Sequence, residues 1–163
     1  GAKKDGKTIA REAVRAIVEN GTKILMLYST EHGDYHFPGG GIDAGESHRE
    51  ALARELAEEC GAQLTEVTGP FGKTVEYATP VESDFDVFCM TSYYYFCEID
   101  SELGEQTLED YEIDLGLEPR WVEIGEARKA NEALLAEDAL LWIKRETLVL
   151  SLLEERLSSK VGK

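Results

Sequence analysis

Residues 37–62 read FPGGGIDAGESHREALARELAEECGA, and this stretch decides the fold expected for the rest of the chain. Five glycines or prolines within positions 38–45 predict backbone conformations that a side chain would forbid. Ser47, followed three residues later by Glu50, has the spacing of a capping box, and Gly61 is a typical C-terminal stop. The sequence therefore predicts a tight turn followed by a helix that begins after Ser47 and ends at Cys60.

Three acidic residues of this predicted helix share one face. Glu55, Glu58 and Glu59 have i, i+3 and i+4 spacing, so their carboxylates are neighbours and repel one another. On an arbitrary helix such a cluster is usually a solvated acidic face, paired with residues such as Arg54. Here it follows a glycine-rich turn with a further acid, Glu46, at its exit. Carboxylates on a rigid element suit Mg²⁺ or Mn²⁺, so this context favours a metal site.

The spacing of these residues resembles a known motif. Gly40, five residues, Glu46, seven residues and then residues 54–62 (RELAEECGA) are similar to the Nudix box, G-x5-E-x7-R-E-U-x-E-E-x-G-U, where U is a bulky aliphatic residue. Ala62 alone departs from the pattern, which affects local packing. The resemblance implies a Nudix-type α/β/α sandwich around a mixed β-sheet, an α/β fold, as a single domain over residues 8–160.

The resemblance also implies an activity and roles for the residues of the box. The activity is that of a MutT-like pyrophosphohydrolase, which hydrolyses a pyrophosphate bond in a nucleoside diphosphate linked to another moiety, using Mg²⁺ (or Mn²⁺). The substrate would be a nucleoside triphosphate, ordinary or oxidised, or a nucleotide sugar. Glu58 and Glu59 would be the principal metal ligands, Glu55 a third ligand or the general base, and the Gly39 carbonyl would complete the inner shell. The implied positioning residues are Arg54, which orients the glutamates, Glu46, which locks the loop through Arg54, and the structural glycines Gly40 and Gly61.

Outside the box the indications are weaker. The resemblance also implies an acid from outside the box that completes the metal site or supplies the general base. Glu112 is our choice among several acids in the loop at residues 101–119, any one of which could instead belong to a solvated acidic loop. Arg11 and Arg15 lie four residues apart on a predicted strand, hence on one face, where they could bind a terminal phosphate or sugar or pair with nearby acids.

Three further residues are candidates for recognition of a nucleobase. Tyr35 and Phe37 beside the glycine turn could stack on a base, although aromatic side chains more often build core. Asn131 follows Trp121 in a predicted helix, where a relative that hydrolyses 8-oxo-dGTP presents an asparagine to the base. That assignment is an analogy at one position.

Composition narrows the range of partners. A net charge of −16 repels nucleic-acid backbones and anionic membranes, so we expect a small-molecule nucleotide substrate, no polymeric nucleic acid and no membrane. The chain would act as a monomer or homodimer. Three cysteines without C-x-x-C spacing favour a reducing compartment, the cytoplasm. Residues 1–7 are expected to be a disordered leader or tag remnant.

An alternative from another functional class is a non-catalytic Nudix-like module that binds a nucleotide such as ADP-ribose as a sensor. Such modules typically lose box glutamates, whereas this chain keeps all of them.

The remaining elements are predicted from periodicity. Residues 8–19 and 23–28 flank Asn20-Gly21 and predict a β-hairpin. Further strands are expected within residues 63–77, broken near Gly69-Pro70, and at 86–99 and 120–123. Helices are expected at 126–135 and 137–157, the last of them covering the sheet.

Overall fold

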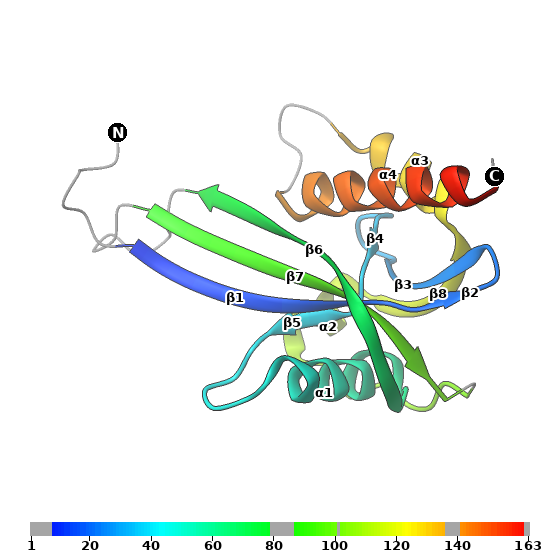
Figure 1. Cartoon of the computed structure of the whole chain (residues 1–163). Coiled ribbons are helices and arrows are strands. Elements are labelled where there is room, and N and C mark those ends of the chain that lie inside the picture. The colour runs from blue at the N-terminus through cyan, green and yellow to red at the C-terminus, as the bar shows by residue number, and fades with distance from the viewer. Residues whose placement is uncertain (1–7, 79–86, 101, 136–140, 162–163) are drawn as a thin grey trace.

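The computed structural model describes residues 8–78, 87–100, 102–135 and 141–161. The predicted leader, residues 1–7, lies outside these ranges, as do Asp86 and residues 137–140. The strands are β1 (Thr8–Ile17), β2 (Glu19–Asn20), β3 (Lys23–Ser29), β4 (Tyr35–His36), β5 (Gly39–Gly41), β6 (Leu64–Ala78), β7 (Val87–Ile99) and β8 (Leu117–Glu123). The helices are α1 (His48–Cys60), α2 (Asp110–Leu115), α3 (Ile124–Glu132) and α4 (Leu141–Val161) (Figure 1).

The strands form two sheets between helical layers. In the first sheet the order is β5-β1-β7-β6, with β1 and β7 parallel and the other pairs antiparallel. In the second sheet, β3 pairs antiparallel with β2, β4 and β8. Helix α1 lies on one side of the strands, while α3 and α4 lie on the other (Figure 1). The expected α/β sandwich around a mixed sheet is therefore confirmed, with the strands divided over two sheets.

The predicted hairpin around Asn20-Gly21 is much shorter than expected. Only Glu19 and Asn20 pair with β3 as a strand, whereas β1 pairs with β7 along its whole length. The predicted turn at Asn20-Gly21 is present, and Gly21 has the positive φ, +66°, that such a turn requires. Periodicity cannot reveal the parallel partner of β1, because β7 lies far away along the chain.

Other element boundaries also differ from the predictions. Strand β6 continues through Gly69-Pro70, and irregularities in its pairing with β7 replace the expected break. Helix α3 begins and ends earlier than predicted, and β8 begins three residues before Arg120. The capping box of α1 is present as predicted, with Ser47 as N-cap and Gly61 at φ +61° as the left-handed stop.

Two buried clusters hold the layers together. One lies on the α1 side of the strands and includes Val14, Leu25 and Leu56, while the other lies on the α4 side and includes Ile17 and Leu150. Strand β1 contributes alternate residues to both clusters, as expected for a strand buried on both faces. The glycine turn at β5 pairs with β1, so this shared strand determines the position of the turn.

No helix in the described part of the chain is long and apolar enough to span a membrane.

Candidate active site

A pocket of about 510 Å³ opens beside the glycine turn. Its walls come from β1, β5, the end of α1, α2 and the start of α4, so segments more than 100 residues apart share it. The volume lies within the range of small-molecule sites. The lining residues are Ala13, Arg15, Leu27, His36, Phe37, Gly39, Gly40, Gly41, Glu59, Met90, Tyr111, Glu112, Asp114, Leu115, Leu117, Trp142 and Arg145.

The guanidinium of Arg54 forms hydrogen bonds to several residues of the box. Its Nε and Nη2 donate to both carboxylate oxygens of Glu46 at 2.8 and 2.9 Å, and Nη2 also donates to the Gly41 carbonyl at 2.9 Å. Its Nη1 donates to Glu55 Oε1 at 2.8 Å. The fork of donors on a guanidinium suits this arrangement. The hydrogen bonds of Arg54 lower the pKa of Glu46 to about 2, so Glu46 stays ionised. Arg54 thus connects the glycine turn, the loop exit and the helix.

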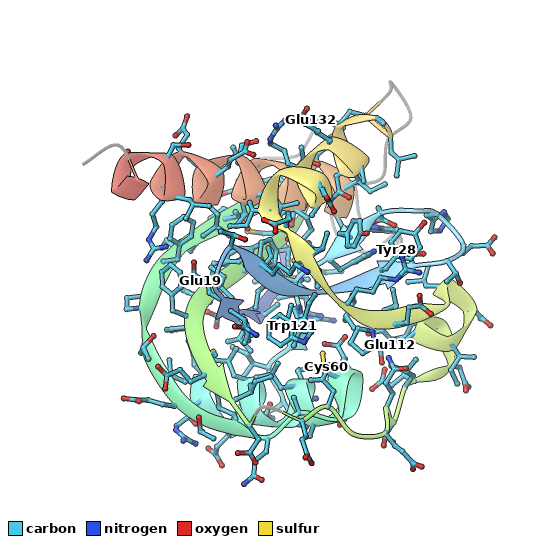
Figure 2. The ribbon with its side chains drawn as sticks, turned by 90° about the vertical axis from the view of Figure 1, so that its right-hand side faces the viewer. Glu19, Tyr28, Cys60, Glu112, Trp121 and Glu132 are labelled. Carbon is cyan, nitrogen blue, oxygen red and sulfur yellow. The ribbon has the colours of Figure 1, made fainter. Side chains whose placement is uncertain are left out.

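Glu59 and Glu112 meet inside the pocket. Glu59 is 3% exposed, and its Oε1 accepts a hydrogen bond from the Gly39 backbone N–H at 2.7 Å. Glu112 is buried on α2, where it also caps the helix by accepting from the Glu109 N–H at 3.0 Å. Figure 2 shows Glu112 pointing toward the end of α1, near Cys60. Glu112, an acid from outside the box, therefore lies beside Glu59 of the box. Its role as a metal ligand stays a prediction.

The electrostatics of this cluster favour a cation. Burial, with smaller contributions from Glu58 and Glu112, raises the pKa of Glu55 to about 7 against the opposing effect of Arg54. Burial and the contact with Glu112 hold the pKa of Glu59 well above its usual value. Buried like charges are costly unless they are paired or bind a metal. A divalent cation bound by carboxylate oxygens would relieve this repulsion, so the donor set fits Mg²⁺ or Mn²⁺.

The side chains of the three box glutamates, Glu55, Glu58 and Glu59, do not all point toward the same place. Glu58 is about one-third exposed, with a carboxylate oxygen 3.6 Å from Arg54 Nη1, and it does not line the pocket. Within the described ranges, no three acidic, histidine or cysteine side chains already form a metal-ligand group. The expectation that Glu55, Glu58 and Glu59 meet at one point is therefore not met by these side-chain positions, in which Glu112 takes the place beside Glu59.

The two predicted arginines differ in position. Arg15 is half-buried and lines the pocket, and its Cα lies opposite that of Gly39 in the antiparallel pairing of β1 with β5. Arg11 is exposed, does not line the pocket, and donates to its neighbour's carbonyl, that of Ala10, at 3.5 Å. The two side chains do share a strand face, but only Arg15 can contact a ligand in the pocket.

The predicted base-recognition residues are used mainly for structure. Phe37 is 1% exposed and packs edge-on against Tyr94 with ring centroids 5.5 Å apart, so its ring is core and not a stacking platform. Asn131 is fully buried, accepting from the Tyr35 N–H at 2.8 Å and donating to the Tyr35 carbonyl at 3.0 Å. These bonds occupy the amide that was expected to contact a base. The ring of Tyr35 packs beside Tyr28, outside the pocket.

Several pocket residues escaped the sequence analysis. Trp142 and His36 face the pocket and are both held by buried Asp34, whose Oδ2 lies 3.1 Å from the Trp142 indole nitrogen and 2.8 Å from His36 Nε2. Arg145 lies one turn further along α4. No sequence signal distinguishes these residues from ordinary surface or core positions, because only the packing of α4 beside β4 brings them together.

Glu146 fastens α4 to the residues before the glycine turn. Its side chain is completely buried, accepting from the Phe37 N–H at 3.1 Å and from the Tyr94 hydroxyl at 2.8 Å. Burial opposes ionisation, but the positive charges of Arg145 and Arg15 outweigh it and hold the pKa of Glu146 below its ordinary value. An ionised, fully hydrogen-bonded carboxylate thus positions the backbone that leads to Gly39.

Glu146→Gln is expected to lower the free energy of unfolding by about 3 kcal/mol, because it leaves Arg145 without this buried counter-charge and turns one acceptor into a donor. Urea denaturation at pH 7 measures the loss. Because the folded-state pKa is depressed, the contribution of Glu146 is present above its ordinary value of 4.5 and is lost as the pH falls further. The difference between wild type and variant should therefore shrink in acid. Glu155→Gln, at an exposed position of α4, is the control, and equal losses in the two variants would contradict this role.

Comparison with known proteins agrees with this architecture. A family model described as NUDIX domain matches residues 10–143. Among solved structures, a NUDIX hydrolase from Nitrosomonas europaea superposes with a TM-score of 0.57 at 19% identity, covering 86% of this chain and 89% of that one. A MutT protein from Bacillus halodurans gives a TM-score of 0.55 at 21% identity, with 74% and 72% covered. At these identities the structures show the fold alone.

Curated relatives match over shorter segments. The chain is 50% identical over 46 residues to the RNA pyrophosphohydrolase of a Nitratiruptor species, covering 28% of this chain and 30% of that protein. It is 43% identical over 58 residues to the CTP pyrophosphohydrolase of Escherichia coli, covering 33% and 43%. The matched segments thus span less than half the length of these relatives. The family model, by contrast, covers most of the chain, and this protein belongs to the NUDIX domain family.

Proposed function

We propose that this protein is a metal-dependent pyrophosphohydrolase that cleaves a pyrophosphate bond in a small nucleotide-like molecule. One observation carries the proposal: two buried carboxylates from different helices, Glu59 and Glu112, face a pocket beside strand β5 (Gly39–Gly41). Burying both acids does not stabilise the fold by itself, because each negative charge makes ionisation of the other less favourable. A site built for a divalent cation and a phosphate explains the cost.

The residues proposed to hold Mg²⁺ or Mn²⁺ are Glu58, Glu59, Glu55 and Glu112, with the carbonyl of Gly39. Bound metal neutralises charge on the phosphates and lowers the pKa of a bound water. Glu58 would have to turn away from Arg54 to join the set, and its one-third exposure leaves room for that rotation.

The other catalytic roles are proposed for side chains and backbone groups of the protein itself. Arg54 holds one oxygen of Glu55 at 2.8 Å, which leaves the other oxygen for a metal ion or for the proton of an attacking water. The pKa of Glu55, about 7, is compatible with a general base, so ligand and base remain the two candidate roles for it. The glycine turn contributes backbone close to the phosphates because Gly39 and Gly40 have no side chains to obstruct them.

The substrate class rests on charge and on the relatives. Relatives named RNA pyrophosphohydrolase and CTP pyrophosphohydrolase support cleavage of a phosphoric anhydride. The net charge of −16 favours a small nucleotide over a polymer, because a polymer presents its backbone to the whole acidic surface. We further infer a cytoplasmic enzyme, monomeric or homodimeric, whose three cysteines are free thiols.

A substrate panel tests the proposal. Purified protein with Mg²⁺ is expected to hydrolyse at least one nucleoside triphosphate, oxidised nucleotide or nucleotide sugar, and EDTA should abolish turnover until Mg²⁺ or Mn²⁺ is restored. Product analysis in ¹⁸O-labelled water identifies the phosphorus that is attacked. A 5′-triphosphorylated RNA oligonucleotide belongs in the same panel, and a faster reaction on RNA would overturn the small-molecule assignment.

Two results would contradict the proposed function. Turnover that survives removal of divalent metal would exclude the metal site. Tight binding of ADP-ribose by calorimetry, with no hydrolysis of any compound under any metal, would instead favour the non-catalytic sensor.

A further inference from the structure

Large hydrophobic side chains gather on a surface formed by α4 and β6. Seven such side chains are exposed in the described part of the chain, and four of them lie on these two elements: Leu148, Leu152, Val75 and Tyr77. Two hollows of about 400 and 260 Å³ are lined mainly by α4 and β6 and share Thr74, so the four side chains belong to one continuous surface. A contiguous exposed apolar patch of this kind is typical of an interaction site.

The backbone of β6 is available at the same surface. This strand of 15 residues pairs with β7 on one side, and no other described strand pairs with its opposite side. Native proteins usually cover long sheet edges, because their unpaired N–H and C=O groups can pair with another chain. The edge beside Val75 and Tyr77 therefore adds to the indication that a partner covers this surface.

The charge of this surface differs from that of the whole chain. Acids outnumber bases 33 to 17 in the sequence, whereas the residues that line the two hollows include more bases than acids. The charged lining residues are Lys73, Lys144, Arg145, Arg156, Glu76 and Glu155. Two copies of an acidic protein repel each other least where negative charge is lowest. A second copy of this chain can therefore approach here more easily than elsewhere.

The exposed face of α4 carries an ordered stripe of four residues. Lys144, Leu148, Leu152 and Glu155 are separated by four, four and three residues, a spacing that places them on one side of a helix. All four are exposed, the two leucines at 55% and 44%. The ion pairs that α4 forms with other described residues involve neither Lys144 nor Glu155. Both charges of the stripe are therefore available to a partner.

This stripe is complementary to itself when two helices run antiparallel. With a two-fold axis between Leu148 and Leu152, each of these leucines faces the other leucine of the second copy. The same register places Lys144 within one residue, a rise of about 1.5 Å, of the partner's Glu155. One arrangement thus satisfies the apolar centre and both charged ends of the stripe.

Arg156 does not oppose this register. It lies next to Glu155 in the sequence and would otherwise bring a positive charge toward Lys144. Its guanidinium instead lies 4.5 Å from the centroid of the Phe96 ring, and its Nη1 is 3.4 Å from a carboxylate oxygen of Glu19. The charge of Arg156 is therefore directed at its own chain, which leaves the exposed Glu155 to meet Lys144.

We propose that this protein forms a homodimer in which the α4 stripes of two copies pack antiparallel about a two-fold axis. Leu148 contacts the partner's Leu152, and Lys144 pairs with the partner's Glu155. In such an isologous interface every contact occurs twice. None of the four stripe residues lines the candidate active-site pocket, so the dimer does not depend on the proposed function.

Sedimentation equilibrium of the full chain tests the dimer. As the protein concentration rises, the wild type is expected to shift from the mass of one chain to the mass of two. Leu148→Lys should weaken association about hundredfold or more, because the two-fold axis places the new charge in the apolar centre twice. Ile113→Lys, at an exposed hydrophobic position on α2, is the matched control and should associate like the wild type. Thermal melting shows whether each variant is folded.

A charge exchange tests the antiparallel register. Lys144→Glu and Glu155→Lys should each weaken self-association about tenfold, because each variant brings like charges together across the axis. An equimolar mixture of the two variants should associate as strongly as the wild type. One copy then carries acids at both ends of its stripe and the other carries bases, so both contacts are between opposite charges.

Three outcomes would overturn the proposed dimer. They are a wild type that stays monomeric at every concentration, a dimer that Leu148→Lys does not weaken, and a mixture of the two charge variants that associates no better than each variant alone. Sedimentation does not measure hydrolysis, so a failure of the proposed function would appear in the substrate panel and not in these experiments.

Discussion

Glu59→Gln is expected to lower kcat by about 10²–10³-fold or more, the scale of losing one principal electrostatic group of an active site. The amide keeps the shape of the side chain and can still accept from the Gly39 N–H, which is 2.7 Å from Oε1 in the wild type. It removes the negative charge that would bind metal. Steady-state hydrolysis of the best compound of the substrate panel, at saturating Mg²⁺, measures the loss.

The same variant should be at least as stable as the wild type. Burial and Glu112 raise the pKa of Glu59, so the ionised carboxylate is unfavourable in the folded protein without a cation. Denaturation in EDTA should therefore show an unchanged or higher free energy of unfolding. Glu66→Gln, an exposed position on β6, is the control for both measurements. A Glu59→Gln enzyme with wild-type turnover would remove Glu59 from the mechanism.

Gly39→Ala is expected to lower the free energy of unfolding by about 3 kcal/mol or more, or to prevent folding. A Cβ at this position would lie 2.0 Å from the Val14 carbonyl oxygen and 2.8 Å from the Arg15 Cα, and the φ of +152° is unfavourable for any side chain. Because both contacts are backbone atoms of β1, relief requires β5 to move away from β1. That movement would also break the hydrogen bond from Gly39 to Glu59.

Gly41→Ala is a closely matched comparison. It lies two residues further along the same short strand, and a Cβ there meets nothing within 4 Å. Its stability should stay within about 0.5 kcal/mol of the wild type. Thermal or urea denaturation of the two variants side by side decides the point, and equal stabilities would show that the close approach of β5 to β1 is not required.

Local sequence signals predicted the structure around α1 well. The N-cap at Ser47, the stop at Gly61 and the shared face of Glu55 and Glu59 all depend on residues within four positions of one another. Arg54 reaches Glu46 across eight residues, and that pair was implied by the resemblance to the Nudix box. Helix geometry sets the contacts between residues that are three or four positions apart, so such contacts can be predicted from the order of residues in the sequence.

Contacts between distant segments could not be predicted in the same way. The amide of Asn131 bonds Tyr35 across 96 residues, and Glu146 holds the Phe37 N–H across 109. Both depend on how α3 and α4 pack over the strands, which periodicity does not specify. Glu112 was chosen from several acids in its loop, and only the fold shows that this one is buried beside Glu59.

The sequence by itself determined the local geometry of helix α1, because its caps and its shared acidic face arise from interactions within one or two helical turns. The family and the class of the fold followed from the resemblance of residues 40–62 to the Nudix box. Tertiary structure alone decided which arginine faces the pocket, which outer acid reaches the box and which aromatic rings are core. Those outcomes depend on strand pairing and helix packing between segments far apart in the chain, where small differences in register change what each side chain touches.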